Sequence, residues 1–377
     1  MKRSTFSKNQ TIYFLKSFFA FSVLLLSAII LLMGCKNKET NEEATSIAVF
    51  IPGVMAGSPI YEMLADGAKK AAEDFAASSI DAIPLVTVIE GGFNQAEWES
   101  QVTTLAASGN YDLIVSSNPS LPVIVSSVSE KFPGQKFLLL DGELTGNPNV
   151  YSLRYNQREQ AYMAGYLAAL ATLEATDFEP AAVTGGEPSL ADARPAPAAG
   201  VKRIGLVAAQ EYPVMNNVIL PGYTEGALAV DSGFSVDFRV VGNWFDAAKA
   251  AELAAGMIRG GIKVLLPIAG GAGAGVVQAA SETGAKVIWF DTSGYAIRPG
   301  TVIGSAILRQ DKAAYEKIML YLKGSLPFGK AEIAGIKNGF VDFIEDDPLY
   351  ISAVSRTIRE KQAALLARLR SGELRLD

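Results

Sequence analysis

The residue types missing from this sequence restrict its chemistry. It has no histidine, and its only cysteine is Cys35. Without histidine, neither a Cys-His pair nor a Ser-His-Asp triad can activate a nucleophile, and an ordinary zinc site cannot form. An enzyme would have to use carboxylate, lysine or oxygen-ligated metal chemistry, and no motif for these is recognisable. We therefore expect a protein that is not an enzyme and carries no cofactor or metal.

The side chains best suited to bind a ligand lie in loops that directly follow short apolar runs. Small, polar and aromatic residues are concentrated there. Because ligands of open α/β sheets bind at the carboxyl ends of strands, these loops predict a binding site. The loops are 52–58, 116–120, 141–143, 242–246, 270–275 and 291–294.

The elements that must position these loops alternate between strands and helices. Runs of β-branched and aliphatic residues predict strands, and apolar residues at three- and four-residue spacing predict amphipathic helices near 61–75 and 247–258. A last helix is predicted over 356–369. This alternation is typical of βαβ units, so the predicted fold class is α/β with parallel sheets. The predicted strands are 47–51, 85–89, 113–116, 137–140, 204–207, 236–241, 264–266, 287–290 and 302–305.

The N-terminus has the layout of a signal peptide. Four basic residues and no acidic one lie in residues 1–34, and an apolar stretch runs from Phe18 to Met33. An uncleaved membrane anchor is the alternative, because the stretch is marginally long enough to cross a bilayer. Leu32-Met33-Gly34-Cys35 resembles the lipobox of bacterial lipoproteins, which implies cleavage before Cys35 and lipidation of that cysteine. Residues 35–45 would then be a flexible tether, and the protein would face the periplasm or the extracellular space from the cell membrane or outer membrane.

The remaining chain has the composition of a globular protein, with 49% hydrophobic and 19% charged residues. Loss of residues 1–34 would change the net charge from -6 to -10, and such an acidic body has no electrostatic footprint for nucleic acid. Its length suits two lobes or one large α/β unit. Segment 174–200, rich in alanine, proline and glycine, is predicted to be a mobile surface insertion.

Several segments, in order, resemble the basic membrane protein (PnrA-like) family of ABC-transporter binding lipoproteins, whose best-understood branch binds purine nucleosides. The resemblance implies a type I periplasmic binding protein, with two α/β lobes that are joined by crossing hinge strands and close on a ligand. Lobe I is expected over 46–152 with a return segment at about 305–330, and lobe II over 153–304 with a C-terminal segment at about 331–377. The segments are 112–115, 132–137, 141–142, 149–152, 159–165, 221–226, 270–275 and 371–374.

The resemblance also implies roles for individual residues. Tyr61 and Trp244 would stack on a purine from either side, although each could instead be a core or capping residue. Asp141 and Asp291 would accept hydrogen bonds from the base and the ribose, although aspartate after a strand is also a common turn or cap residue. Asp246 is predicted to cap the helix that follows it.

The other candidate ligand contacts are Ser58, Asn118, Gly271, Glu62 and Arg309. Glycine at 271 would allow close approach to a sugar, because the run lacks the Gly-Lys-Ser/Thr ending of a phosphate loop. Glu62 and Arg309 stand at departures from the family pattern. A base-recognising carboxylate of the family is either lost or replaced by Glu62. Arg309 follows Leu308, which occupies the place of a ribose-binding lysine.

Three functions agree with this sequence. The first is a receptor that delivers a nucleoside-like solute to an ABC permease and its ATPase. The second keeps the receptor role but binds a sugar or another small polar solute. The third is a surface-interaction lipoprotein whose partner binds the 174–200 insertion.

Overall fold

The structure is a computed structural model that describes residues 44–78, 83–177 and 201–376. The signal peptide, Cys35 and nearly all of the tether predicted from the sequence lie outside the described residues. So does most of the predicted insertion, of which only the start is described, as the last turn of a helix that ends at Asp177.

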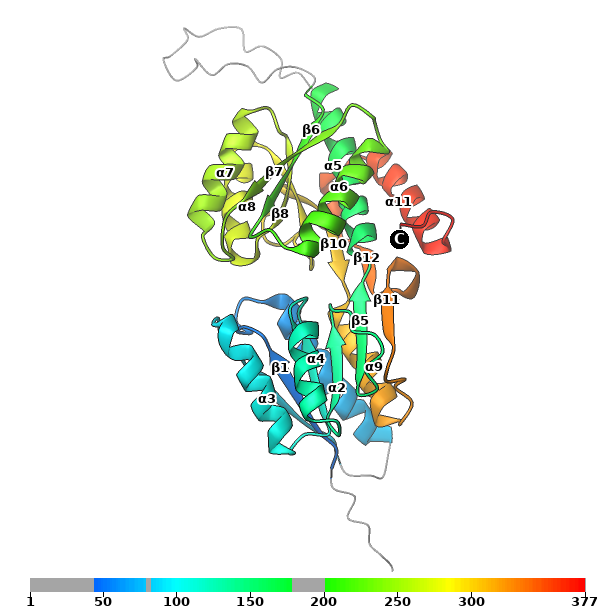
Figure 1. The fold of residues 1–377 in the computed structure, drawn as a ribbon. Coiled ribbons are helices and arrows are strands. Elements are labelled where there is room, and N and C mark those ends of the chain that lie inside the picture. The colour runs from blue at the N-terminus through cyan, green and yellow to red at the C-terminus, as the bar shows by residue number, and fades with distance from the viewer. Residues whose placement is uncertain (1–43, 79–82, 178–200, 377) are drawn as a thin grey trace, which may run out of the picture. The chain divides into compact units, whose positions relative to one another are not determined.

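Two six-stranded sheets form the framework (Figure 1). In sheet A the strands follow the order β11-β5-β4-β3-β1-β2 and all neighbours are parallel. In sheet B the order is β12-β10-β9-β8-β6-β7, and only β12 is antiparallel to its neighbour. The strands are β1 (Ser46–Ile51), β2 (Leu85–Glu90), β3 (Leu113–Ser117), β4 (Lys136–Leu140), β5 (Val150–Tyr155), β6 (Arg203–Ala208), β7 (Ser235–Val240), β8 (Val264–Ile268), β9 (Lys286–Asp291), β10 (Val302–Leu308), β11 (Ala331–Ala334) and β12 (Val341–Phe343).

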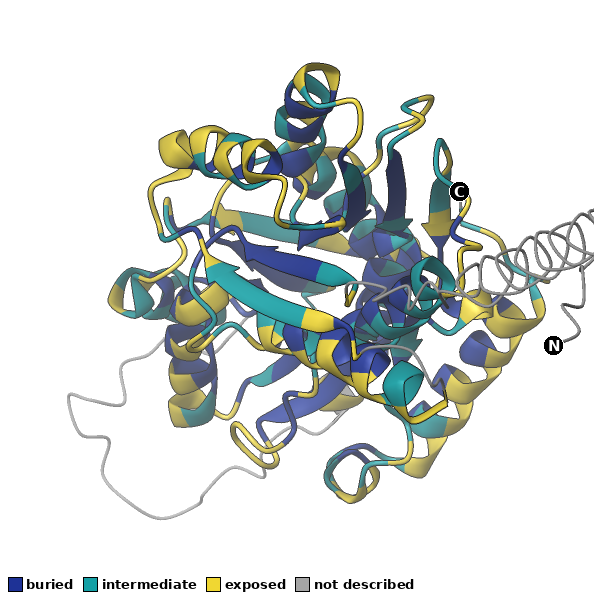
Figure 2. Ribbon diagram, turned by 90° about the horizontal axis from the view of Figure 1, so that it is seen from below, coloured by how far each residue is buried: buried dark blue, intermediate teal, exposed yellow. Residues whose placement is uncertain are grey.

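Helices cover both faces of each sheet. They are α2 (Pro59–Ser78), α3 (Trp98–Ser108), α4 (Leu121–Lys131), α5 (Gln157–Asp177), α6 (Leu220–Leu228), α7 (Ala247–Arg259), α8 (Gly273–Thr283), α9 (Gln310–Leu322), α10 (Pro348–Ala353) and α11 (Arg356–Ser371). The described chain also contains four short helical segments: η1 (Gln95–Glu97), η2 (Met215–Ile219), η3 (Gly270–Ala272) and η4 (Ile336–Asn338). Figure 2 shows buried residues concentrated on the strands and on the inner faces of the helices.

Strand β1 shows why the apolar runs form buried central strands. Its side chains alternate, so that Ile47, Val49 and Ile51 join one core cluster with α2. Ala48 and Phe50 point to the other face and join a second cluster with α3 and α4. All five side chains are fully buried, which explains a continuous apolar run rather than alternating polarity.

The helices that connect the strands pack in unusually close pairs. A Cβ atom on Gly165 of α5 would lie 2.0 Å from the carbonyl oxygen of Tyr223 in α6, and one on Gly226 of α6 would lie 2.1 Å from the carbonyl oxygen of Tyr162. Any larger residue would force the two helix backbones apart. Glycine is therefore required at both positions by steric contact.

The chain passes between the two sheets at three points. It leaves sheet A after β5 and enters α5, it leaves sheet B after β10 and enters α9, and it passes from β11 to β12. Helix α9 packs on α2 of the first lobe. These crossings match the hinge arrangement of the predicted type I binding-protein fold.

The nine strands predicted from the sequence are confirmed, each within a few residues of its predicted bounds. The predicted C-terminal helix is α11, and its apolar side chains Ile358, Leu365, Leu366 and Leu369 are buried. One lobe boundary differs from the expectation. Residues from about 331 were assigned to lobe II, but Ala331–Ala334 forms β11, which pairs with β5 and so completes sheet A.

Candidate ligand-binding site

The loop after β1 presents Tyr61 in the first turn of α2. The Tyr61 ring packs against Gly53, where a Cβ atom would lie 3.2 Å from ring atom Cε2. Its hydroxyl donates to the carbonyl oxygen of Pro52 at 3.1 Å and accepts from Asn118 Nδ2 at 3.2 Å. The loops after β1 and β3 are thus joined through this hydroxyl. The Ser58 carbonyl accepts from the amides of Tyr61 and Glu62 and so starts the helix.

Asp141 and Asp291 share a rare backbone conformation. They follow β4 and end β9, with φ angles of 55° and 69°, and they are the only residues other than glycine with positive φ in the described part of the chain. Aspartate tolerates the left-handed region better than most residues, but the conformation still costs free energy. Such positions are concentrated at functional sites, where the surrounding structure maintains them.

The two aspartates interact electrostatically although each belongs to a different sheet. Burial, assisted by the negative charge of Asp291, raises the pKa of Asp141 to about 8. Burial also raises the pKa of Asp291 to about 6, opposed by a hydrogen bond from Gln160 Nε2 at 3.1 Å. Asp291 therefore ionises first, and near neutral pH the pair retains about one proton.

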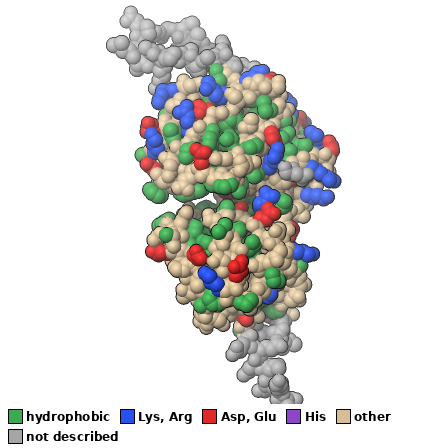
Figure 3. All heavy atoms as spheres, in the orientation of Figure 1, with side chains coloured by type: hydrophobic (Ala, Val, Ile, Leu, Met, Phe, Trp, Pro, Cys, Tyr) green, Lys and Arg blue, Asp and Glu red, His purple; other side chains and the backbone are tan. Residues whose placement is uncertain are grey.

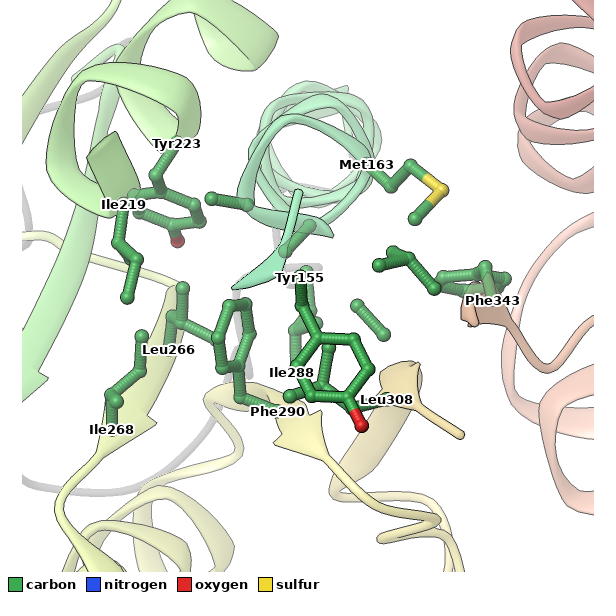
Figure 4. Close-up of a cluster of buried hydrophobic side chains, with 14 of the residues drawn as sticks. Tyr155, Met163, Ile219, Tyr223, Leu266, Ile268, Ile288, Phe290, Leu308 and Phe343 are labelled. Atoms are coloured by element: carbon green, nitrogen blue, oxygen red, sulfur yellow. The ribbon is translucent and has the colours of Figure 1, made fainter. Parts of the chain in front are cut away.

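Tyr155 and two glutamines extend this polar cluster at the crossings between the sheets. The Tyr155 hydroxyl donates to Gln310 Oε1 at 2.5 Å. Burial, with the charges of Asp141, Asp311 and Asp291, raises the pKa of Tyr155 well above its usual value. In Figure 4 the oxygen of Tyr155 points toward the edge of the apolar cluster.

The second lobe contributes two aromatic rings. Trp244 lies in the loop after β7 and is 40% exposed, and its ring centroid is 6.3 Å from that of Tyr212, which lies in the loop after β6. Burial and the charges of Asp291 and Asp141 raise the pKa of Tyr212. Tyr212 thus interacts electrostatically with both aspartates, and with Trp244 it forms an aromatic surface in the second lobe.

The glycine run after β8 lies against this aromatic surface. A Cβ atom on Gly270 would lie 3.3 Å from Cε3 of Trp244, and one on Gly271 would lie 3.5 Å from the Trp244 carbonyl oxygen. The Ala272 amide donates to the same carbonyl oxygen at 3.1 Å. Glycine thus lets the turn η3 pack closely against the loop that carries the tryptophan.

Two of the predicted ligand contacts, Glu62 and Arg309, are not part of this polar cluster. Glu62 is exposed in the first turn of α2. Arg309 follows β10 and pairs with Asp311, with Nε 3.3 Å from Oδ1. Asp246 caps α7 as predicted, because its side chain accepts from the Lys249 amide at 2.9 Å.

Sequence reasoning missed Tyr155, Gln160, Tyr212 and Gln310. Tyr212 could have been found, because it follows β6 just as the predicted candidates follow other strands. The two glutamines carried no signal, because they stand in stretches that read as ordinary helix starts.

Neither a metal-binding cluster nor a membrane-spanning helix is found in the described part of the chain. No group of three or more histidine, cysteine, aspartate or glutamate side chains is placed to hold a metal ion. None of the described helices is both long and apolar enough to span a bilayer. On the face seen in Figure 3, basic and acidic side chains are interspersed.

Known proteins share this fold. A solute-binding protein of an ABC transporter system from Aeropyrum pernix superimposes with a TM-score of 0.71 at 22% identity, covering 88% of this chain and 93% of that one. A glucose-galactose binding protein from Geobacillus stearothermophilus superimposes with a TM-score of 0.57 at 15% identity, covering 81% and 99% of the two chains. These similarities confirm the type I periplasmic binding protein fold.

Sequence comparison identifies the family. The ABC transporter nucleoside-binding protein BmpA of Lactococcus lactis is 28% identical over 49% of this chain, a match that spans only 46% of that protein. Basic membrane protein D of Borreliella burgdorferi is 22% identical over 84% of each chain. The profile of the family described as "ABC transporter substrate-binding protein PnrA-like" matches residues 44–374. The chain therefore belongs to the PnrA-like family of ABC transporter substrate-binding proteins, as its sequence motifs had indicated.

Proposed function

We propose that this chain is a lipid-anchored, extracytoplasmic receptor that binds a purine nucleoside and delivers it to an ABC permease and its ATPase. The observation that carries this proposal is the electrostatic interaction of Asp141 with Asp291, one from each sheet, and of these aspartates with Tyr61 and Tyr212, one from each lobe. A solute that bonds to both aspartates would bridge the two lobes. Such bridging favours the closed state that a permease recognises.

The chemistry of this cluster suits an uncharged, flat solute with hydroxyl groups. Tyr61 and the Tyr212–Trp244 pair offer ring faces, which stack on any purine. The two aspartates offer acceptors for base N–H groups and ribose hydroxyls. A phosphorylated ligand would be repelled, because Asp291 is ionised at neutral pH. Arg309, which directly follows β10, would not offset this repulsion, because it is paired with Asp311.

Isothermal titration of the purified protein with inosine, guanosine and adenosine tests the proposal. We expect saturable heat with at least one of them. Asp291→Asn should weaken binding, because the amide replaces an acceptor by a donor, whereas Asp346→Asn, at an exposed position, should not. Absence of heat with all three nucleosides would remove the nucleoside from the proposal.

A sugar or another small polar solute is the alternative ligand. Leu308 favours this alternative, since it is 2% exposed in the core and so offers no polar contact at the place where the family resemblance implies a lysine. Mass spectrometry of the small molecules that copurify with the protein separates the two ligands.

The lipid anchor is tested at Cys35. Cells that express the chain should incorporate labelled palmitate into it, and Cys35→Ser should abolish the label and release the protein from the membrane fraction. Retention of the Cys35→Ser protein in membranes would favour an uncleaved anchor.

A further inference from the structure

Two fully buried glutamines next to the aspartate pair have unused hydrogen-bonding atoms. Gln160 and Gln310 are both 0% exposed. Neither Gln160 Oε1 nor Gln310 Nε2 has a hydrogen-bond partner within the described structure. Native proteins leave very few buried polar atoms unpaired, so each such atom requires an explanation.

The unused atoms belong to two hydrogen-bonded groups, and the charge of Asp291 in one group acts on Tyr155 in the other. Gln160 uses its Nε2 to donate to Asp291 Oδ1 at 3.1 Å and to the Ala306 carbonyl oxygen at 3.0 Å, which leaves Oε1 free to accept. Gln310 uses its Oε1 to accept from the Tyr155 hydroxyl, which leaves Nε2 free to donate. The two groups thus hold one open acceptor and one open donor.

The position of these glutamines in the fold connects them with ligand-driven closure. Gln160 lies in the first turn of α5, which follows the crossing from sheet A to sheet B. Gln310 is the first residue of α9, which follows the return crossing after β10. A ligand that contacts both side chains would therefore contact two of the three segments about which the lobes move.

We propose that Gln310 Nε2 and Gln160 Oε1 bind hydroxyl groups of the ligand, so that the site takes a solute with adjacent hydroxyls, such as the ribose of a nucleoside or a free sugar. A hydroxyl is suited to this cluster because it donates and accepts at the same time. It can accept from Gln310 while it donates to an aspartate, or donate to Gln160. This inference rests on the receptor function proposed above and specifies which part of the ligand meets the hinge.

A thermodynamic cycle between protein and ligand tests the inference. Wild type and Gln310→Met are titrated with inosine and with 2′,3′-dideoxyinosine, which lacks the adjacent 2′- and 3′-hydroxyls and keeps the 5′-hydroxyl. Methionine preserves the length and shape of glutamine but cannot donate. We expect the substitution to weaken inosine binding about tenfold, as for the loss of one well-placed hydrogen bond, and to leave dideoxyinosine binding nearly unchanged.

Gln362→Met is the matched control. Gln362 is also 0% exposed and also has an unpaired Oε1, but its Nε2 donates to the Met163 carbonyl oxygen within the second lobe. Its replacement should leave both affinities unchanged. Gln310→Met removes the partner of the Tyr155 hydroxyl, so Tyr155→Phe/Gln310→Met, which removes both partners, is measured beside it and should show the same loss of inosine binding.

The outcomes separate this inference from the proposed function. Equal weakening of inosine and dideoxyinosine, or of neither, would overturn the role of Gln310 while the nucleoside receptor stands. Wild type could instead bind no nucleoside but bind D-ribose, D-xylose or D-glucose, with Gln310→Met weakening that binding about tenfold. The proposal of a nucleoside ligand would then be wrong, and the proposed hydroxyl contact of Gln310 would be supported. If wild type binds none of these compounds, both are wrong.

Discussion

Replacement of Asp141 by asparagine should stabilise the ligand-free protein at pH 8 and remove most of the pH dependence of its stability between pH 6 and 8. Asparagine keeps the size of the side chain and tolerates the φ angle of 55° at this position. It cannot ionise, so it avoids placing a second negative charge in the buried cluster with Asp291.

The sign and size follow from proton linkage. An unfolded chain has released the Asp141 proton well below pH 6, whereas the folded protein retains it until about pH 8. Because the folded state binds the extra proton, the free energy of unfolding decreases as the pH rises through this window. One proton corresponds to at most about 1.4 kcal/mol per pH unit, so wild type should lose roughly 2.5 kcal/mol between pH 6 and 8. Asp291, with its pKa raised to about 6, adds a similar decrease at lower pH.

Urea unfolding followed by tryptophan fluorescence measures this effect. The protein is refolded from denaturant first, to remove bound solute, and its stability is measured at pH 6, 7 and 8. Asp346→Asn, at an exposed position, serves as the control and should follow wild type. Parallel pH dependences of wild type and Asp141→Asn would refute the electrostatic description of the pair.

Three further substitutions test the site and its scaffold. Trp244→Ala should weaken inosine binding about 5- to 100-fold, because a stacking partner is lost, whereas Phe245→Ala, at the adjacent residue that is 78% exposed, should leave titration heats unchanged. Tyr61→Phe keeps the ring and loses two hydrogen bonds, so thermal unfolding should show a loss of about 1 kcal/mol in stability. Inosine affinity should change little, and a large loss of affinity would show that the hydroxyl, not the ring, binds the ligand. Gly165→Ala should destabilise the protein by about 2 kcal/mol or more, because its methyl group overlaps a carbonyl oxygen of the next helix, and a stability equal to that of Gly134→Ala, where the space is open, would contradict the packing described.

Much of the fold could be predicted from the sequence because its central strands are buried on both faces. A short unbroken run such as 47–51 has the length and apolar content of a buried strand, and the nine strands predicted from such runs are present. Strand β5 was missed because Ser152 and Arg154 interrupt its apolar pattern. Strand β11, with Glu332 at its centre, was missed for the same reason.

The candidate site could be predicted only in part. Asp141 and Asp291 were found because polar residues follow strands where ligands bind, but their positive φ angles and their mutual effect on pKa depend on the folded chain. Gln160 and Gln310 could not be found, since only the fold shows that they are buried and that each keeps one unpaired atom.

The crossings between the sheets have a consequence for the order in which the chain can fold during synthesis. The first lobe is not made from the first part of the chain alone. Residues 310–334 supply two of its elements. Helix α9 packs on α2, and strand β11 pairs with β5 at the edge of sheet A. A chain that emerges from its N-terminus must therefore extend past the whole of sheet B, apart from β12, before sheet A is complete, so the lobe that is synthesised first is completed late.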